Sequence, residues 1–136
     1  MPYRNWRQHS FNTHFLLGLA GKERSKAHAM ATGRVLSAID PEYVGALSLM
    51  LIPETPLFDD YESGAFRLIE PQEMLAELRT MIAGTSLTSG LFHANHASNY
   101  LPIRARFPKE KETTLRLIDQ ALAGKVPLKP EYLRAL

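Results

Sequence analysis

The sequence contains no cysteine. This absence excludes disulfide bonds, a cysteine nucleophile, a cysteine-type zinc site and an iron–sulfur cluster held by cysteines of this chain. The sequence also lacks an uninterrupted apolar run of the roughly 18 residues that a membrane-spanning helix needs. Its first residues, MPYRNWRQHSFNTHF, have no apolar stretch like that of a secretory signal. Together these absences favour a cytoplasmic protein.

An excess of charge of one sign is also missing. Sixteen basic residues are nearly offset by fourteen acidic ones, which leaves a net charge of +2. A dedicated nucleic-acid-binding protein usually has a larger basic excess or a clear basic stripe, so nucleic acid is not the partner we expect. The 136 residues are enough for a single domain. We divide it into an irregular segment 1–9, an α/β core 10–124 and a surface tail 125–136.

Apolar runs alternate with segments of helical periodicity along the chain. The predicted strands cover Phe11 to Leu19, Tyr43 to Ile52 and about Ser89 to His93. The predicted helices cover Lys26 to Ile39 with Ser25 as cap, Pro71 to Ala83 and Pro108 to Ala123. This order predicts an α/β fold with three parallel strands alternating with helices. Because chemistry in such sheets lies at the carboxyl ends of the strands, the informative segments are AGKERS, PETPL and ANHASN.

The turn LLGLAGKERS joins the first strand to the first helix. Its glycines would let backbone N–H groups approach an anion or a cofactor. A phosphate loop is excluded, because its first glycine would fall on Leu16 and because Glu23 stands where a hydroxyl ligand to magnesium is needed. The alternative is a tight strand-to-helix turn with no ligand. For LSLMLIPETPL, likewise, we expect either a buried strand ended by proline or a strand end that contacts a flat ligand.

The polar stretch LFHANHASNYLPIRARFP has three possible roles. His93 and His96 would share a face on a helix but not on a strand, and no Cys, Asp or Glu lies within residues 91–99, so we predict no metal site. Its asparagines suit either a structural hydrogen-bonding loop or a loop that faces a ligand. The basic residues from Arg104 to Lys111, with Tyr100 and Phe107, could contact a nucleic-acid backbone. Interleaved glutamates weigh against that third role.

Three segments together resemble a known family. GLAGKERS, IDPEYVGALSLMLIPETPLFDDYESGAFRL and FHANHASNYLPIRARFPKEKETTLRLIDQALAG resemble the C-terminal part of radical SAM enzymes, in particular a group of bacterial iron–sulfur oxidoreductases. The resemblance extends from about Thr13 onward. It implies the C-terminal portion of a partial (β/α)6 barrel, in which Phe11 to Leu19 is the fifth strand and Leu49 to Ile52 belongs to the sixth.

The resemblance also implies site residues. Those facing S-adenosylmethionine would be Leu17, Gly18, Leu19, Glu23, Leu51, Ile52 and Pro53. Those facing the substrate would be His93, Asn95, His96 and Asn99. Two positions depart from the family pattern: the acidic Glu23 comes one residue late, and Glu54 replaces the usual glycine of a PGTPL turn. The second departure puts the backbone shape of that turn in question.

The family's cysteine loop, CxxxCxxC, is absent, and the chain has no room for the first four strands of the barrel. We therefore expect a fragment or degenerate C-terminal portion of such an enzyme. It would contribute to the cavity for S-adenosylmethionine and substrate, with no catalytic residue, metal ligand or iron–sulfur cluster of its own. The alternative is a non-catalytic α/β binding or protein-interaction domain. In either case, the strand near Phe11 to Leu17 would have an exposed edge, available for self-association or for a missing N-terminal barrel segment.

Overall fold

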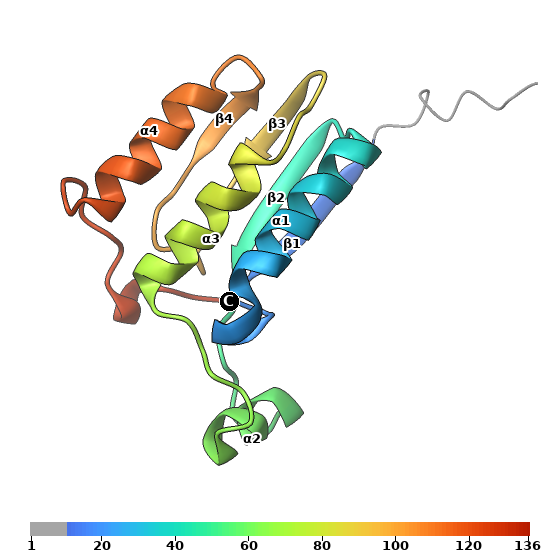
Figure 1. Ribbon diagram of the computed structural model, residues 1–136. Coiled ribbons are helices and arrows are strands. Elements are labelled where there is room, and N and C mark those ends of the chain that lie inside the picture. The colour runs from blue at the N-terminus through green and yellow to red at the C-terminus, as the bar shows by residue number, and fades with distance from the viewer. Residues whose placement is uncertain (1–10) are drawn as a thin grey trace, which may run out of the picture.

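The computed structural model describes residues 11–136, so the segment 1–9 expected to be irregular lies outside the described residues. The chain forms an α/β fold with one four-stranded sheet in the order β1-β2-β3-β4 (Figure 1). The strands are β1 Asn12–Leu17, β2 Tyr43–Ser48, β3 Gly90–His93 and β4 Arg104–Phe107. The helices are α1 Gly21–Ile39, α2 Pro56–Ser63, α3 Pro71–Ala83, α4 Lys111–Leu122 and the 3-10 turn η2 Glu131–Leu133. The predicted α/β class is confirmed, and β1, β2 and β3 are parallel as expected.

The fourth strand corrects the prediction of three. β4 runs antiparallel to β3, and the hairpin continues into the loop, where the Ala94 N–H donates to the Ile103 carbonyl at 2.8 Å. The sequence RARF alternates exposed arginines with the buried residues Ala105 and Phe107. Such a period of two is the signature of a half-buried strand. It was missed because only four residues carry it and a polar loop precedes them.

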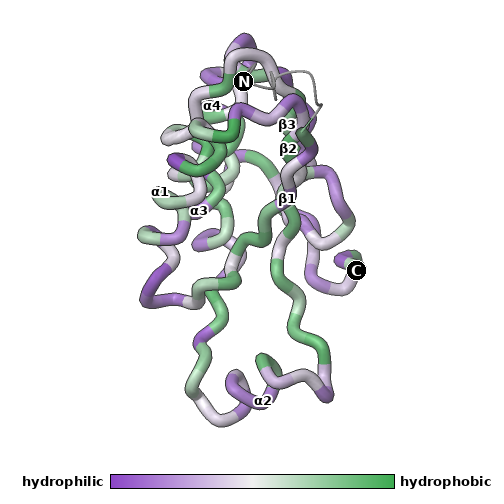
Figure 2. The backbone as a smooth tube through the Cα atoms, turned by 90° about the vertical axis from the view of Figure 1, so that its right-hand side faces the viewer, coloured by the Kyte–Doolittle hydropathy of each residue, from purple (hydrophilic) through white to green (hydrophobic). Residues whose placement is uncertain are grey.

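The helices α1, α3 and α4 all cover the same face of the sheet (Figure 2). The strands point alternate side chains at these helices, and the rings of Phe92 and Phe107 stack at 5.0 Å inside the layer between. Apolar burial of this kind is the main source of stability. Among residues 11–136, no helix has both the length and the apolar character needed to cross a bilayer. The core of buried apolar residues includes Leu17, Leu36, Val44, Ala46, Leu75, Leu78, Met81, Ile82, Phe92, Phe107, Leu115 and Ile118.

Several boundaries differ from those predicted. β2 ends at Ser48, five residues before the proline that was expected to stop it. α1 begins at Gly21, so Ser25 lies inside the helix and is not its cap. Residues 56–63 form the two-turn helix α2, which Thr55 caps by accepting from the Phe58 N–H at 3.3 Å. Figures 1 and 2 show α2 standing apart from the sheet beyond the carboxyl ends of β1 and β2.

Candidate functional site

Three loops meet at the edge of the sheet where β1, β2 and β3 end. The Leu49 N–H donates to the Leu17 carbonyl at 2.9 Å, which joins the segment after β2 to the end of β1. The Ser48 N–H donates to Ser98 Oγ at 3.1 Å, which joins β2 to the loop after β3. The starts of the loops after β1 and β2 therefore lie beside the ANHASN loop after β3, whereas PETPL leads away from the sheet into α2. Carboxyl ends of parallel strands commonly carry binding sites.

The turn after β1 is held by a buried carboxylate on α3. Gly18 has a left-handed φ of +85°, and its N–H donates to Glu77 Oε1 at 3.1 Å. Ser25 Oγ donates to the other oxygen of Glu77 at 2.6 Å, and His28 Nε2 lies 3.5 Å from the first. A Cβ on Gly18 would lie 3.0 Å from Met74 Cε, so the turn has little room for a side chain. Gly18 is thus a buried shaping residue, with its N–H already engaged.

The other residues proposed to face S-adenosylmethionine divide into buried and exposed groups. Leu17 is buried on the helix side of the sheet. Glu23 is exposed and pairs with Arg67, with 2.6 Å between Oε1 and Nε. Leu19 and Ile52 are 50% and 43% exposed. Leu51 is half-buried and Pro53 is exposed, also in the segment after β2.

The four residues proposed to face the substrate do not converge. Asn99 is buried: its amide nitrogen donates to the Ala46 carbonyl at 2.8 Å, and its oxygen accepts from Ser48 Oγ at 2.8 Å. Asn95 and His96 are exposed in the loop, and His96 Nδ1 lies 2.9 Å from Ser98 Oγ. His93 lies on β3, half-buried, with its ring edge-on to Tyr43 at 5.1 Å. In the part of the chain that the structure describes, no three metal-ligating side chains come together.

Arg134, which was not a candidate residue in the sequence, holds the loop after β3 through hydrogen bonds. Its guanidinium donates to the carbonyls of Ser98 at 2.7 Å and Leu49 at 2.9 Å and to Tyr100 Oη at 2.6 Å. It also pairs with Glu131 and lies 4.1 Å over the ring of Tyr100. The tail that was expected on the surface therefore contributes a buried arginine. Sequence alone gave no signal for it, because Ser98, Leu49 and Tyr100, to which it donates, lie 34 or more residues away.

Burial and the hydrogen bond to Glu131 raise the pKa of Tyr100 to about 12, although the charge of Arg134 acts in the opposite direction. The hydroxyl of Tyr100 donates to Glu131 Oε2 at 2.7 Å and accepts from Arg134. Tyr100 and Phe107 are both buried, so neither ring is available to stack on a nucleic-acid base. Lys111 donates to the carbonyls of Ala83 and Thr85, which also removes it from the basic patch considered for nucleic acid.

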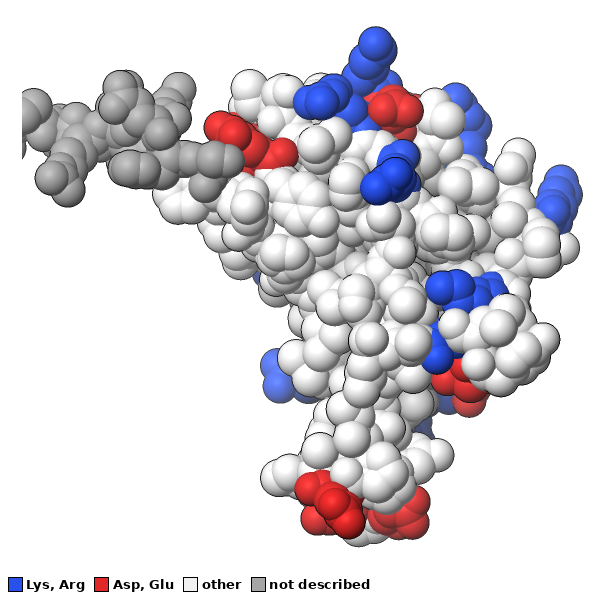
Figure 3. All heavy atoms as spheres, turned by 180° about the vertical axis from the view of Figure 1, so that it is seen from behind, with Lys and Arg blue, Asp and Glu red and all other residues white. Residues whose placement is uncertain are grey.

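The face of the sheet away from the helices carries a different set of polar groups. His14, Gly45, His93 and Arg104 are register partners on β1 to β4, so they form one row across the sheet. Tyr43 lies beside the row, with ring centroids 5.7 Å from His14 and 5.1 Å from His93. Figure 3 shows this side of the molecule, where the centre is uncharged and both basic and acidic side chains lie toward the upper end.

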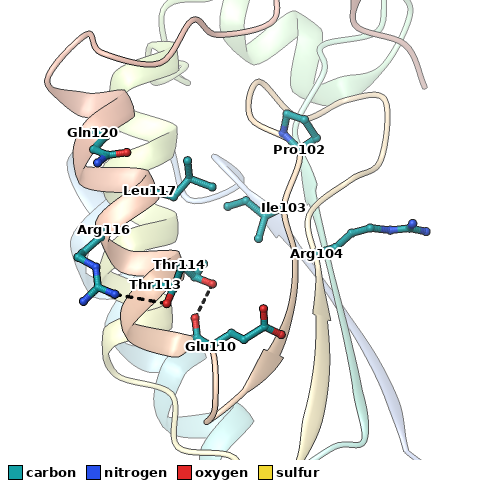
Figure 4. Close-up of a pocket in the computed structure, with 9 residues that line it drawn as sticks. All are labelled: Pro102, Ile103, Arg104, Glu110, Thr113, Thr114, Arg116, Leu117 and Gln120. Atoms are coloured by element: carbon teal, nitrogen blue, oxygen red, sulfur yellow. Dashed lines mark hydrogen bonds between the residues drawn. The ribbon is translucent and has the colours of Figure 1, made fainter.

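A separate hollow of 430 Å³ lies at the other edge of the sheet, between the segment leading into β4 and α4. Thr113 and Gln120 line it from α4, while Ile103 contributes an apolar wall (Figure 4). Arg104 extends away from α4, toward the open face of the sheet. The hollow has a mixed lining and no polar group that converges on its centre, so we do not assign it a ligand.

Comparison of the chain with protein-family models, with curated proteins and with solved structures found no match.

Proposed function

We propose that the chain is a C-terminal portion of a radical SAM iron–sulfur oxidoreductase. It would supply part of the wall of the cavity for S-adenosylmethionine and substrate, without being catalytically complete alone. The observation that supports this most is the direction of the chain: β1, β2 and β3 follow one another across the sheet, with α1 and α3 on one face. A doubly wound sheet reverses its order and has helices on both faces. In a barrel, each successive strand is added on the same side of the previous one, the helices lie outside, and the other face of the sheet lies inside.

The two edges of the sheet also differ in the way that this proposal requires. The outer edge of β4 is covered: the Arg106 N–H donates to Glu110 Oε1 at 3.0 Å, and the Glu110 N–H donates back to the Arg106 carbonyl. The β1 edge, NTHFLL, has no proline, lysine or acidic residue to block pairing. Strands preceding this chain in a whole barrel would add at the β1 edge.

The carboxyl edge of the sheet has groups suited to the adenine of S-adenosylmethionine. Leu19 and Ile52 present exposed apolar surface from the two adjoining loops, and a flat aromatic ring packs well on such surface. The Gly18 N–H donates to Glu77, so Gly18 would not bind the adenine through this group. Its role would be to hold the turn close to the adenine ring. Glu23 would reach a ligand only by leaving Arg67. When bound beside a cluster held by the missing segment, S-adenosylmethionine would supply the radical for the parent reaction.

Binding of S-adenosylmethionine to the folded chain tests the proposal. We expect saturable changes in the amide NMR signals of residues 18–20 and 50–52 at millimolar ligand. Ile52→Lys places a charge where the ring would pack, so it should abolish these changes. Val35→Lys makes the same change at a 53% exposed position on α1 and should leave them intact. If wild-type protein shows no change at these amides, the proposal is wrong.

The alternative, a non-catalytic α/β interaction domain, is favoured by one observation. At the carboxyl edge, the Gly18 N–H and the Asn99 amide are already engaged inside the protein. A scaffold that had lost its ligand would be expected to satisfy these groups internally, because buried polar groups need partners. The absence of S-adenosylmethionine binding in a well-folded chain would support this alternative.

A further inference from the structure

We infer that the open face of the sheet binds an oxyanion, a carboxylate or phosphate group of a small molecule, through His14, His93 and Arg104. The inference rests on the proposed function only in taking this face as the inner wall of a substrate cavity. The oxyanion site itself stands on the geometry of the row and can be tested without S-adenosylmethionine.

The register of the strands brings the three side chains onto one line. His14 pairs with Gly45, Gly45 with His93, and His93 with Arg104. Neighbouring strands lie about 4.8 Å apart, so the row spans about 14 Å, and His93 and Arg104 are direct neighbours. Alternation along each strand directs these side chains away from the helices, because the intervening residues fill the core.

Gly45 determines how the rings gather. A Cβ at Gly45 would lie 2.6 Å from Cδ2 and 3.0 Å from Nε2 of His14, so the His14 ring occupies the space over this glycine. From there it approaches Tyr43, which also contacts His93. The two imidazoles are thereby turned toward the middle of the sheet face. Glycine is needed at position 45 because a residue without a Cβ leaves room for the His14 ring.

The charged strand residues on this face are all basic. Its strand residues are Asn12, His14, Leu16, Tyr43, Gly45, Leu47, Leu91, His93, Arg104 and Arg106, with no Asp or Glu. Within residues 11–136, the side chains of His14, His93 and Arg104 make no ion pair or hydrogen bond. The polar groups at the carboxyl edge, in contrast, are satisfied by one another. A planar guanidinium beside an imidazole is well suited to an oxyanion.

The residues beside the row, nearer the carboxyl ends of the strands, indicate what the remainder of the ligand would be. Leu16 and Leu47 are paired, half-buried, and lie one step nearer the carboxyl edge on the same face. A ligand entering from that edge would pass apolar surface before its anionic end met the row. The structure therefore favours a small molecule with an apolar body and a terminal oxyanion.

Hexanoate and hexyl phosphate are suitable probes, with hexanamide as the neutral control. At one fixed pH and ionic strength, we expect the anions, but not hexanamide, to shift the ring protons of His14 and His93 saturably. The relative affinities of the two anions show whether the row prefers a carboxylate or a phosphate. Arg104→Gln should weaken binding about tenfold, as expected for loss of one charge-assisted hydrogen bond. Arg116→Gln, an equal change on the exposed side of α4, should have no effect.

Gly45→Ala provides a second test that keeps every donor. Its Cβ must displace the His14 ring, which is the end of a flexible side chain, so the fold should survive while anion binding weakens. Equal shifts with hexanamide, or unchanged affinity in Arg104→Gln, would overturn the inference. Anion binding without S-adenosylmethionine binding would support the oxyanion site and reject the proposed function. Binding of S-adenosylmethionine without anion binding would reject the oxyanion site and leave the proposed function in place.

Discussion

At the scale of single residues, Arg134 joins separate parts of the candidate site. Its side chain is 2% exposed and contacts the loops after β2 and β3 together. Replacing it with Met keeps the apolar stem but leaves the carbonyls of Ser98 and Leu49 without their donor. We expect Arg134→Met to lower the free energy of unfolding by about 2–4 kcal/mol. Urea denaturation measures this loss, with Arg34→Met on exposed α1 as a control. A loss no larger than the control's would contradict the interpretation.

Tyr100 makes a prediction about high pH. Its folded pKa of about 12 exceeds the ordinary value of about 10. The stabilisation from its hydroxyl is therefore complete below about pH 10 and is lost as the pH rises through 12. Ultraviolet titration of wild type minus Tyr100→Phe should show one phenol that ionises near pH 12. Ionisation of that phenol near pH 10 in folded protein would show that burial and the hydrogen bond to Glu131 do not raise its pKa.

At the scale of elements, Glu77 attaches α3 to the turn after β1. Glu77→Leu would leave the Gly18 N–H and the Ser25 hydroxyl without an acceptor, so we expect a loss of about 2–4 kcal/mol of stability. Glu77→Gln should cost less, because its carbonyl oxygen still accepts and the Ser25 hydroxyl can accept from its amide. Hydrogen exchange at the Gly18 amide should accelerate in Glu77→Leu but not in Gln72→Leu, an exposed change on α3. Unchanged exchange would show that Glu77 does not hold the turn.

Helices α3 and α4 are joined by Arg79 and Asp119. The hydrogen bond from Arg79 lowers the pKa of Asp119, and the same bond raises that of Arg79. A lowered carboxyl pKa gives stability that is present above the ordinary value of about 4 and lost as the pH falls through the folded pKa. We expect Asp119→Asn to lower the Tm slightly at neutral pH, and this difference to vanish at low pH. A difference that does not change with pH would reject the pair as its cause.

Most helices and strands could be predicted from the sequence, whereas contacts between distant segments could not. Helical periodicity located α3 and α4 within a few residues, and apolar runs located β1, β2 and β3, because these signals are local. β4 was missed because its alternation is short. Glu77 did leave a signal, a charge between Met74 and Met81 on an otherwise apolar stripe, which indicates a buried partner. Arg134 left none. The row from His14 to Arg104 could not be predicted, because it depends on the register of four strands.

At the scale of the whole molecule, the sheet formed by residues 11–136 has one protected edge and one edge that no other described strand pairs with. Pro102 and Pro108 flank β4, and Glu110 engages its backbone. On β1, the carbonyls of Phe11 and Leu17 accept from the β2 side. In a parallel ladder the alternate residues, including Asn12 and His14, then direct their backbone groups outward. His28 contacts only the last outward carbonyl, that of Leu16, at 3.3 Å.

An open edge of this kind pairs with another strand when one is present. In the isolated chain the available strand is β1 of a second copy, so we expect a dimer about a two-fold axis whose fraction rises with concentration. Asn12→Pro removes one outward N–H without removing a bond to β2, so it should shift the equilibrium several-fold toward monomer. Sedimentation equilibrium measures both, with Val35→Lys as a control away from the edge. A wild-type chain that stays monomeric at high concentration, or a dimer that Asn12→Pro leaves unchanged, would mean that β1 is not the pairing edge.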